Sequence, residues 1–417
     1  MKRVVITGMG WINSIGNSQA EVLHSLKNGI SGISVNPDFS GPECPVKLAG
    51  VPKGFHFPST DVEDWIYPKT VPITREQLRS MSPNALYGFF AMREAIQNAS
   101  LPPELVSNPR TGTLCASAGS VWISYENAHI LANKGALRCN PMCVVSSIPG
   151  TLNINIAACY KIKGSSLGFA SACASSSHAI GHGTNLIRLG RQDIIFAVGA
   201  EDCSKFTIQP FAAVRALSSK TDPRTTPCAF DAGRDGFVAC GGATALVLEE
   251  FEHAKKRGAT IYAEIIGWGE SADGYNVMAP EPEGEGLSRS MANALQDSNL
   301  LPDQVDYINA HATATPAGDI AEIKAIKRIF TGKRPFVSST KSLTGHGLSL
   351  AGALEAGICA LSIHEGFIPV SANITRLDPA CEGVPIVTHP IDSKPSIVMS
   401  NSSGFGGTNV SLVFKKL

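Results

Sequence analysis

Apolar residues along this chain fall into short continuous runs that alternate with longer stretches of helical period. The short runs are rich in β-branched residues and bounded by Gly, Pro, Asn or Ser, which is the pattern of buried strands. They cover residues 3–10, 111–117, 165–172, 193–201, 244–250, 262–269, 305–311, 335–340, 396–402 and 409–416. The helical stretches cover residues 82–99, 174–190, 284–299, 316–330 and 349–364. Strands that alternate with helices in this way predict an α/β fold with buried sheets.

The chain also carries a weak internal repeat. GGATALVLEE (241–250) resembles GGTNVSLVFKK (406–416), and SSLGFASACASSSHAIG (165–181) resembles RPFVSSTKSLTGHGLSLAG (334–352). Both members of the second pair run from a strand through a turn of small residues into a glycine-rich helix. The repeat therefore predicts two copies of one α/β unit.

We place the two copies at residues 1–250 and 251–417 and expect them to pack as one body, since no linker separates them. The first copy holds additional sequence ahead of Cys173. Cys173 and the His346 region occupy matching turns of the two copies. Copies packed back to back would bring these two turns to one place.

Composition narrows the classes of function. Of the 417 residues, 43% are hydrophobic, and 35 Lys and Arg balance 35 Asp and Glu. A chain with no net charge is not expected to bind nucleic acid or an anionic membrane over its whole surface. No run approaches the roughly 18 apolar residues that span a bilayer. The first residues, MKRVVITGMGWINSIG, predict a buried strand and a turn rather than a signal peptide, because the apolar run is short and contains Gly8 and Gly10. We therefore expect a soluble, cytoplasmic protein.

Two cofactor classes find little support in the sequence. Eleven cysteines are scattered along the chain, and CNPMC (139–143) has no second Cys or His pair at zinc-like spacing. GMGWIN (8–13) has Asn13 in place of the third glycine of a dinucleotide fingerprint, and no acidic residue is well placed after it. We expect no disulfide framework, no metal and no nicotinamide cofactor.

One cysteine occupies a position suited to chemistry. Cys173 lies in SACASSSHAIG, where a predicted strand gives way to a predicted helix. The dipole and free N–H groups of a helix N-terminus lower the pKa of a thiol and favour a nucleophilic thiolate. The small Ala and Ser residues beside Cys173 leave room for an incoming thioester. The alternative is a buried structural cysteine.

Two histidine motifs follow in the second copy. In NAHATATPAGDIAE (309–322), His311 precedes Thr313, Thr315 and a helix that carries Asp319 and Glu322 one turn apart. A neutral imidazole at this place can polarise a carbonyl, and the acids can orient neighbouring groups. The alternative is a core histidine with helix-capping acids.

In KSLTGHGLSLAGALEAG (341–357), Lys341 and His346 flank a tight turn, and Glu355 lies farther along the predicted helix. A lysine beside a histidine disfavours the imidazolium and would keep His346 neutral. In NSSGFGGTN (401–409), the glycine-rich backbone can offer an N–H to an oxyanion, and Phe405 can act as a gate. The alternatives are a solvent-exposed lysine with a turn histidine, and a plain glycine-rich turn.

Together, in this order and spacing, the motifs closely resemble those of the β-ketoacyl-ACP synthases, condensing enzymes of the thiolase superfamily. The matching motifs are S-A-C-A, N-A-H-x-T-x-T-P-x-G-D and K-x-x-x-G-H, and the resemblance covers the whole chain. IYAEIIGWGESADG and APEPEGEG make it more similar to type I, the elongating synthase of bacterial fatty-acid biosynthesis. The resemblance implies a thiolase-like fold, with two duplicated halves in αβαβα layers. It also implies a cytoplasmic acyltransferase that works as a homodimer.

The resemblance further implies a role for each site residue. Cys173 would take an acyl chain from acyl carrier protein, with its own backbone N–H and that of Phe405 as the oxyanion hole. His311 and His346 would hold malonyl-ACP as CO₂ leaves and the enolate attacks, which gives 3-oxoacyl-ACP. The other roles are Lys341 as a further catalytic residue, Asp319, Glu322 and Glu355 as supporting charges, Thr313 and Thr315 along the pantetheine tunnel, and Gly119 at the floor of the acyl pocket. No metal or nicotinamide is needed, because decarboxylation drives the reaction.

Acyl carrier protein, which is acidic, is the implied partner. Arg75 and Arg79 in TREQLRSMSP match the region of the basic patch that receives it, although Glu76 stands where type I members can have lysine. The alternative is an ordinary charged surface. The implied homodimer pairs through the first half, and a heterodimer with a related subunit is the alternative.

The chain departs from the family pattern at four positions. Ala312 and Ala314 replace the residues usual in H-G-T-S-T, Ser403 stands where an aromatic is common, and Cys228 replaces an arginine found in many members. The departures bear on the gate, the acyl-chain preference and the pathway.

Three other functions are weighed against fatty-acid elongation. A specialised polyketide or aryl-polyene ketosynthase is favoured somewhat by the departures. A thiolase would use a further cysteine near the end of the chain, which NSSGFGG lacks. A non-catalytic partner like the chain-length factors usually loses its nucleophile, whereas Cys173 is present.

Overall fold

The computed structural model describes all 417 residues and contains one ten-stranded sheet, in the order β10-β9-β13-β14-β8-β1-β7-β6-β4-β5. The first part of the chain supplies β1 (Val4–Ile12), β4 (Thr111–Ala116), β5 (Ser166–Phe169), β6 (Ile194–Glu201) and β7 (Gly242–Glu250). The second part supplies β8 (Ala263–Ala272), β9 (Tyr307–Asn309), β10 (Phe336–Ser338), β13 (Ile397–Gly404) and β14 (Thr408–Lys415). Each of these strands coincides with one of the predicted apolar runs.

The two sets of strands have the same topology. Within each set, number the strands one to five in chain order. Moving outward from the contact between β1 and β8, both sets then run in the order one, five, four, two, three. β1 and β8 pair antiparallel only over Val4–Ile6 and Ala263–Ile265, so the sets join along a short seam. The structure confirms the duplicated α/β architecture. The predicted boundary after residue 250 falls at the start of α10 (Phe251–Lys256), between the two sets, and stays a prediction.

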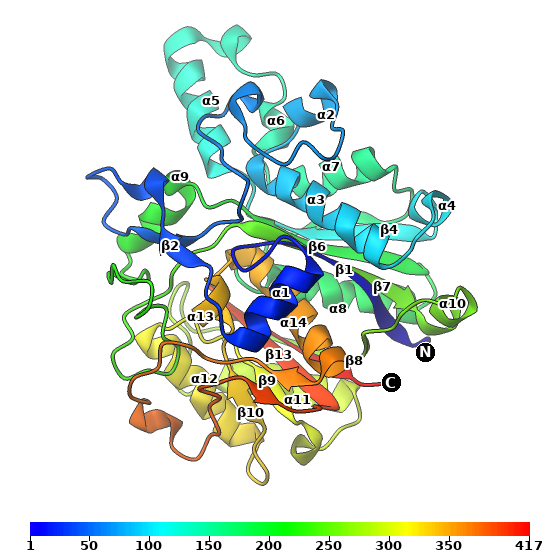
Figure 1. Cartoon of the computed structure of the whole chain (residues 1–417), viewed down its shortest axis with the longest axis vertical. Helices are drawn as coiled ribbons and strands as arrows, with labels where there is room; N and C mark the ends of the chain where they lie inside the picture. The colour runs from blue at the N-terminus through cyan, green and yellow to red at the C-terminus, as the bar shows by residue number, and fades with distance from the viewer.

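Helices form the remaining layers (Figure 1). α8 (Ser175–Arg188) and α14 (Ala351–Glu365) pack against each other between strands of both sets. α3 (Pro83–Asn98) and α7 (Thr151–Tyr160) cover the outer face of the first set. α11 (Glu285–Asp297), with α12 (Pro316–Ile329) beside it, covers the outer face of the second set. This is the αβαβα layering that the resemblance implies.

The two central helices position the site. α14 is buried at every residue from Ala351 to Ile363, which agrees with its being apolar around its circumference except at Glu355 and Ser362. Gly352 permits close packing of the two helices, because a Cβ there would lie 2.6 Å from the backbone N of Ser177 on α8. Since α8 follows the turn of Cys173 and α14 follows the loop of His346, this packing sets the two turns side by side.

Sequence inserted into the first set builds a cap above the sheet (Figure 1). The cap contains α2 (Arg75–Arg79), α5 (Val121–Lys134) and α6 (Cys143–Ser146). The apolar pattern of the sequence does not predict these helices, because they lack a buried apolar face: of the 14 residues of α5, only Ile123 is buried. Their exposed apolar side chains include Val121, Tyr125, Leu131 and Val144. The cap therefore leaves apolar surface uncovered.

β5 differs from its prediction. The sequence predicts a buried strand here, but Ser166, Leu167 and Gly168 are exposed, and Leu167 keeps 54% of its surface accessible. β5 is the last strand of the sheet and pairs only with β4. Its second edge therefore offers unpaired backbone groups.

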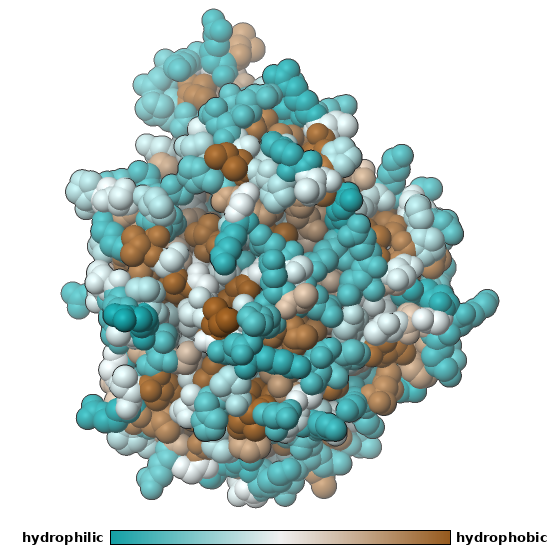
Figure 2. All heavy atoms as spheres, viewed as in Figure 1, coloured by the Kyte–Doolittle hydropathy of each residue, from teal (hydrophilic) through white to brown (hydrophobic).

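Short elements complete the chain. They are α1 (Gln19–Asn28), β2 (Ile33–Val35), β3 (Leu48–Gly50), α4 (Pro103–Val106), α9 (Lys205–Ile208), α13 (Lys341–Thr344), β11 (Phe367–Ile368) and β12 (Ile391–Asp392). None of the helices combines the length and the hydropathy that crossing a bilayer requires. On the face shown in Figure 2, hydrophobic side chains lie in small groups among hydrophilic ones.

Candidate functional site

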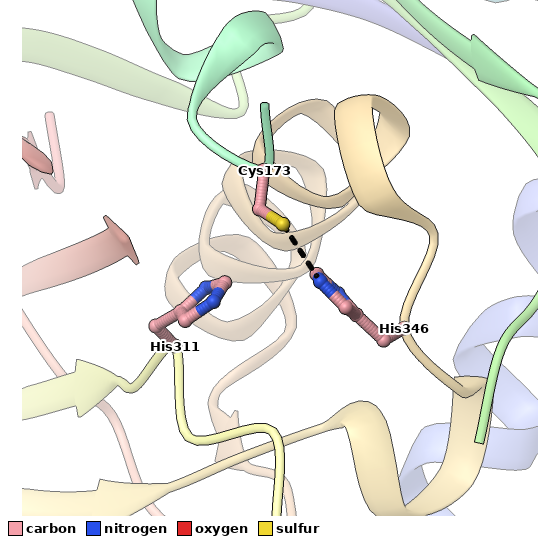
Figure 3. A group of neighbouring side chains, drawn as sticks. All are labelled: Cys173, His311 and His346. Atoms are coloured by element: carbon pink, nitrogen blue, oxygen red, sulfur yellow. Dashed lines mark hydrogen bonds between the residues drawn. The ribbon is translucent and has the colours of Figure 1, made fainter. Parts of the chain in front are cut away.

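Cys173 lies in a strained turn between β5 and α8 (Figure 3). Ala172, directly before it, has a φ of 49°, in the left-handed region that costs an L-residue roughly 1–2 kcal/mol. The Ser171 N–H donates to Ser175 Oγ (2.8 Å), and the Ser175 hydroxyl donates to the Ala172 carbonyl (2.6 Å). These bonds fix the backbone from which the thiol projects.

Two histidines from the second half of the chain converge on this turn (Figure 3). His311 follows β9, and His346 follows α13. Cys173 Sγ lies 3.0 Å from His346 Nε2, and the three side chains bring their ligand atoms within 4.8 Å of one another. The two imidazole centroids are 5.3 Å apart. The structure thus brings the two equivalent turns together, as the repeat predicts.

Burial keeps both imidazoles neutral. It lowers the pKa of His346 well below its ordinary value, and the charge of Lys341 lowers it further. The pKa of His311 is also lowered well below its ordinary value, by burial first and then by Lys341 and His346. Near pH 7 each ring therefore offers one N–H donor and one acceptor nitrogen.

The thiol does not follow the expectation from its helix. Burial raises the pKa of Cys173 to about 12, and the charge of Lys341 opposes this rise only in part. The helix N-terminus favours a lowered pKa, but Cys173 packs against an apolar cluster that includes Phe237 and Leu348, where a thiolate loses its hydration. Cys173 is therefore a thiol at neutral pH, and His346 Nε2 is placed to take its proton.

Lys341 lies next to the histidines but outside the cavity that they face. It forms an ion pair with Glu355 of α14, and the two side chains are only 3% and 2% exposed. Burial raises the pKa of Glu355 to about 7, and Lys341 opposes that rise. Neither residue lines the cavity in front of the histidines. Lys341 therefore acts on the imidazoles through its charge, without a contact in the cavity.

Glu322 fixes the backbone that carries His311. Its carboxylate accepts the N–H groups of His311 (3.0 Å) and Ala312 (2.7 Å) and the side-chain amide of Asn401 (3.1 Å). Because Glu322 lies on α12 and Asn401 on β13, one carboxylate joins three segments. This is the geometry of an orienting residue.

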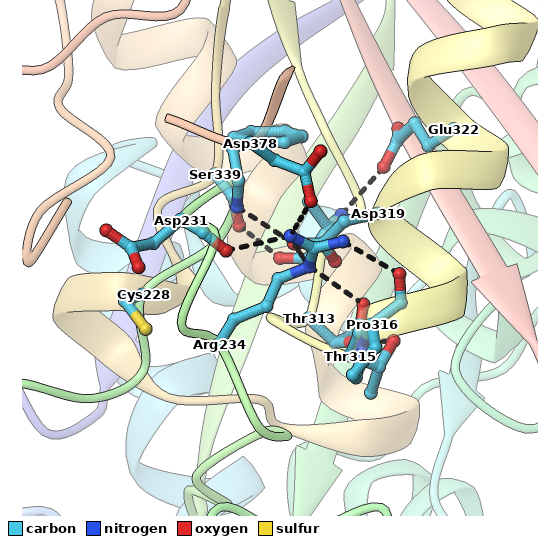
Figure 4. A network of polar contacts seen from close by, with 12 residues as sticks. Cys228, Asp231, Arg234, Thr313, Thr315, Pro316, Asp319, Glu322, Ser339 and Asp378 are labelled. Atoms are coloured by element: carbon cyan, nitrogen blue, oxygen red, sulfur yellow. Dashed lines mark hydrogen bonds and ion pairs between the residues drawn. The ribbon is translucent and has the colours of Figure 1, made fainter. Parts of the chain in front are cut away.

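Arg234, which sequence reasoning missed, is the centre of a polar network behind the His311 loop (Figure 4). It donates to the carbonyls of Asp231, Thr315 and Pro316 and pairs with Asp378 (2.7 Å) and Asp319 (3.4 Å). Burial raises the pKa of Asp319 to about 7, and Arg234 opposes that rise. The sequence RDGFV (234–238) could have indicated this role, because an arginine directly before a buried apolar stretch needs charged or polar partners.

Cys228, one of the departures from the family pattern, lies beside this network (Figure 4). Lys220 Nζ is 3.3 Å from its sulfur. Burial raises the pKa of the Cys228 thiol, and the charge of Lys220 opposes that rise. A cation therefore stands here even though the arginine expected from the resemblance is absent.

A cavity of about 400 Å³ opens in front of Cys173, His311 and His346. Its other walls include Phe211, Phe237, Leu348, Thr313, Thr315, Glu322, Ser403 and Phe405. The hydroxyl oxygens of Thr313 and Thr315 are 3.1 Å apart on one wall. On another wall, the ring centroids of Phe405 and Phe211 are 5.9 Å apart. An extended substrate with an apolar end and polar amides suits such a lining.

The turn that carries Phe405 touches the turn that carries Cys173. A Cβ on Gly404 would lie 3.0 Å from the backbone N of Cys173 and 2.9 Å from the Ser171 carbonyl oxygen, so the approach depends on glycine. The backbone N–H groups of Cys173 and Phe405 therefore stand on neighbouring segments, as an oxyanion hole requires. Their role stays a prediction.

Gly119 does not lie on this cavity. Its φ is 80°, and a Cβ there would collide with the backbone of residues 147–149. The glycine is therefore required by a close approach of two backbone segments, and its assignment to the acyl-pocket floor stays a prediction. Arg75 and Arg79 also lie apart from Cys173, on α2 in the cap, where they line a separate hollow with Met142 and Cys159.

Cys173, His311 and His346 are also the one group of three ligating side chains close enough to hold a metal ion. A structural zinc site takes four ligands, and a catalytic zinc site takes three and keeps an open position. The present group has three ligands, but zinc binds a thiolate, whereas burial raises the pKa of this thiol to about 12 and the thiol is hydrogen-bonded to an imidazole. This arrangement favours nucleophilic chemistry at sulfur.

The chain matches two family models and is similar to known proteins along its whole length. Residues 1–254 match the N-terminal domain model of the beta-ketoacyl synthases, and residues 262–375 match the C-terminal domain model. The chain is similar to 3-oxoacyl-[acyl-carrier-protein] synthase 1 of Haemophilus influenzae, at 43% identity over 100% of this chain and 99% of that protein. Among solved structures it is similar to a beta-ketoacyl synthase from Burkholderia phymatum, with a TM-score of 0.92, 36% identity and full coverage of both chains. It is also similar to the ishigamide ketosynthase/chain length factor, with a TM-score of 0.89, 29% identity, and coverage of 100% of this chain and 99% of that chain.

The buried imidazoles give a prediction for pH. His311 and His346 should remain neutral as the pH falls from about 8 to about 5.5, a range in which an exposed histidine takes up a proton. Because the unfolded chain does bind these protons, the folded state should lose stability as the pH falls through about 6.5. Lys341→Met removes the charge that disfavours the imidazolium and should raise both histidine pKa values. NMR of protein labelled with ¹³C in its histidine rings measures the titration.

Lys341→Arg is the matched control, because it keeps the positive charge and should leave both rings neutral over the same range. Titration of either ring near pH 6.5 in the unchanged protein would contradict the assignment of neutral imidazoles.

Proposed function

The chain belongs to the β-ketoacyl synthase family, and we propose that it condenses an acyl group with malonyl-ACP, by decarboxylation, to give 3-oxoacyl-ACP in fatty-acid elongation. The observation that carries this proposal is the contact of 3.0 Å between Cys173 Sγ and His346 Nε2, with His311 beside it and a cavity in front. A nucleophile and two neutral hydrogen-bonding groups then face one substrate space.

The first step transfers the acyl group to Cys173. The sulfur attacks the carbonyl carbon of the acyl thioester, and the thiol proton passes by way of His346 Nε2 to the pantetheine sulfur that leaves. The carbonyl oxygen, negative in the tetrahedral intermediate, lies against the N–H groups of Cys173 and Phe405. The acyl-cysteine splits one difficult reaction into two easier ones.

The second step uses the histidines. Once Cys173 is acylated it no longer donates to His346 Nε2, and the ring takes the tautomer with its proton on Nε2. His311 and His346 then each donate an N–H to the carbonyl oxygen of the malonyl thioester, the bond to the carboxylate breaks, and CO₂ leaves. The enolate carbon attacks the acyl carbonyl on Cys173, the new carbon–carbon bond forms, and the carbon–sulfur bond breaks. The released thiolate regains a proton from water. Thr313 and Thr315 line the path for pantetheine, and Lys341, Asp319, Glu322 and Glu355 hold the surrounding charges and segments.

No metal or nicotinamide takes part in this scheme. The loss of CO₂ supplies the driving force, and no step transfers a hydride. A hydrogen-bond donor aimed at the enolate oxygen typically contributes 10²–10³ in rate, so two imidazoles account for the required stabilisation of charge.

A specialised polyketide or aryl-polyene ketosynthase is the second candidate. Ser403, a small hydroxyl residue on the cavity wall, and the likeness to the ishigamide ketosynthase/chain length factor favour it. The higher identity to 3-oxoacyl-[acyl-carrier-protein] synthase 1, over the full length of both chains, favours fatty-acid elongation.

Cys173→Ala tests the nucleophile. The unchanged protein, incubated with acyl-ACP, should gain one acyl group on the peptide that contains Cys173, and the variant should gain none and lose at least ~10³ of its condensation rate. Mass mapping of the peptides and a panel of acyl chain lengths with malonyl-ACP measure this. Cys203→Ala, which changes another cysteine of the same apolar cluster, is the control. Acylation at another residue, or none, would contradict the proposal, and a preference for polyketide intermediates would favour the second candidate.

Acyl carrier protein is the proposed partner, and the proposed docking site is α2 of the cap. Arg75 and Arg79 are exposed there and can meet acidic side chains, although the ion pair of Arg75 with Glu63 (2.7 Å) already compensates part of the charge. Glu76 on the same helix weakens the positive field further.

Reversal of both charges tests this docking site. Arg75→Glu with Arg79→Glu should weaken the binding of acyl-ACP by about tenfold at low salt and reduce its salt dependence, while the rate of Cys173 alkylation stays unchanged. The control is Lys255→Glu with Lys256→Glu on α10, which lies beside β1 and β7 and outside the cap that holds α2 (Figure 1). Equal affinity of the double-arginine variant and the unchanged protein, measured by fluorescence anisotropy at two salt concentrations, would reject the site.

A second copy of the chain is the proposed occupant of the open sheet edge. β5 has an unpaired edge, Leu167 is 54% exposed, and Ile154 on the adjoining α7 is 41% exposed. A two-fold axis at β5 would let two edges pair antiparallel and cover both apolar side chains.

Leu167→Lys should therefore convert a dimer into a monomer of 43.9 kDa in analytical ultracentrifugation. Leu189→Lys, at the exposed end of α8, is the matched control and should leave the mass unchanged. A dimeric Leu167→Lys variant would disprove pairing at this edge. A protein that is monomeric without substitution would favour a related subunit as the partner.

A further inference from the structure

His178 links the turn of the nucleophile to the second half of the molecule. It lies in the first turn of α8 and is only 9% exposed. Its Nδ1 is 2.8 Å from the hydroxyl of Ser171, and its Nε2 is 3.1 Å from a carboxylate oxygen of Glu270. Ser171 belongs to the turn of Cys173, whereas Glu270 belongs to β8. One imidazole therefore bridges the two sets of strands at the site.

The partners of His178 define its hydrogen bonds. An ionised carboxylate only accepts, so Nε2 carries the ring proton and donates to Glu270. In the neutral ring Nδ1 then accepts the proton of the Ser171 hydroxyl. Burial lowers the pKa of His178 and the charge of Glu270 opposes this, so the neutral form is favoured. The direction of both bonds follows from the chemistry of the partners.

The Ser171 hydroxyl bond restrains a strained backbone. Ala172 has its φ at 49°, a conformation that persists only where the surroundings enforce it. Ser175 holds the Ser171 N–H and the Ala172 carbonyl, and His178 holds the Ser171 side chain. Loss of the His178 bond leaves the turn free to rotate Ala172 toward an ordinary φ. Such a rotation would move both the thiol and the N–H of Cys173.

We propose that His178, oriented by Glu270, is a positioning residue that keeps the Cys173 thiol and N–H aimed at the acyl carbonyl. His178 does not line the cavity and touches no reacting group. The inference rests on the proposed function and assigns to the acyl-transfer step a residue outside the Cys173, His311 and His346 group.

A purely structural role is the competing explanation. His178 also belongs to an aromatic group on the surface side of α8, in which His182 lies 6.3 Å from His178, 5.3 Å from Phe169 and 5.2 Å from Trp268. If packing alone mattered, substitutions at His178 and His182 would affect stability and every partial reaction alike.

Two amide substitutions separate the bonds of the ring. In His178→Asn the amide oxygen can take the place of Nδ1 and accept from Ser171, but the side chain is too short to reach Glu270. In His178→Gln the amide reaches the place of Nε2 and keeps the bond to Glu270, but the bond to Ser171 is lost. Ser171→Ala removes the same bond from the other side, and His182→Gln is the matched control on the same helix face.

Three rates are measured on each folded variant: alkylation of Cys173 by iodoacetamide, single-turnover acyl transfer from acyl-ACP, and decarboxylation of malonyl-ACP. His178→Gln and Ser171→Ala should slow acyl transfer and alkylation at least tenfold. Decarboxylation, which uses His311 and His346, should stay within twofold. His178→Asn should transfer acyl groups at least threefold faster than His178→Gln, and His182→Gln should match the unchanged protein in all three rates.

The outcomes distinguish this inference from the proposed function. Acyl transfer by His178→Gln within twofold of the unchanged protein would overturn the positioning role, as would equal losses in all three rates. If the unchanged protein neither accepts an acyl group nor decarboxylates malonyl-ACP, the proposed function fails. The alkylation rates would still report whether His178 positions the thiol.

Discussion

The contact between Cys173 Sγ and His346 Nε2 is the interaction on which the rest of the structure depends. It joins equivalent turns of two duplicated units, and it forms only because α8 and α14 pack closely at the centre of the molecule. This close packing also buries charged groups, which is unfavourable. Lys341 and Glu355 lie out of water as an ion pair, and an ion pair of this kind loses several kcal/mol of hydration per charge. Such a pair is weak evidence for stability, but it explains the electrostatics of the site.

Burial also decides the protonation state in which the reaction starts. It raises the pKa of the Cys173 thiol to about 12 and lowers those of His311 and His346, so no thiolate–imidazolium pair is formed in advance. The thiol must give up its proton during the attack, and His346 is in place to accept it. Neutral rings also suit the proposed second step. A neutral imidazole is a weak acid, so its N–H can stabilise an enolate oxygen without delivering a proton to the enolate carbon.

The sequence correctly predicts the duplicated α/β units and the strands and helices that are buried in the core. Strands such as β6 and β7 and helices such as α14 are long apolar runs, and the repeat around Cys173 and His346 predicts that their turns meet. Besides Arg234, three features escaped prediction for physical reasons. α5 buries only Ile123 and so has no helical apolar period, while β5 is apolar but stands at the sheet edge. The raised pKa of Cys173 depends on the apolar residues packed around it, which no local motif records.

The division of labour between the two units explains the composition of SACASSSH. The proposed nucleophile comes from the first unit, and the histidines proposed to hold the malonyl carbonyl come from the second. The proposed reaction therefore requires the two units to be held in register within a fraction of an ångström. Large side chains beside Cys173 would separate them. The serines instead make short bonds: Ser175 closes the turn, Ser176 accepts the N–H of Ala353 (2.9 Å), and Ser177 meets Ser402 (2.8 Å).

The bonds of Ser175 stay within the turn of Cys173, whereas those of Ser176 and Ser177 reach α14 and β13 of the second unit. A run of serine, which the sequence alone would suggest is a flexible polar stretch, is therefore part of the contact surface between the two units at the candidate site. His178 continues the same surface by one residue, from the turn of Cys173 to Glu270 of β8. The small residues around the cysteine serve the alignment of the two units as much as the space needed by the substrate.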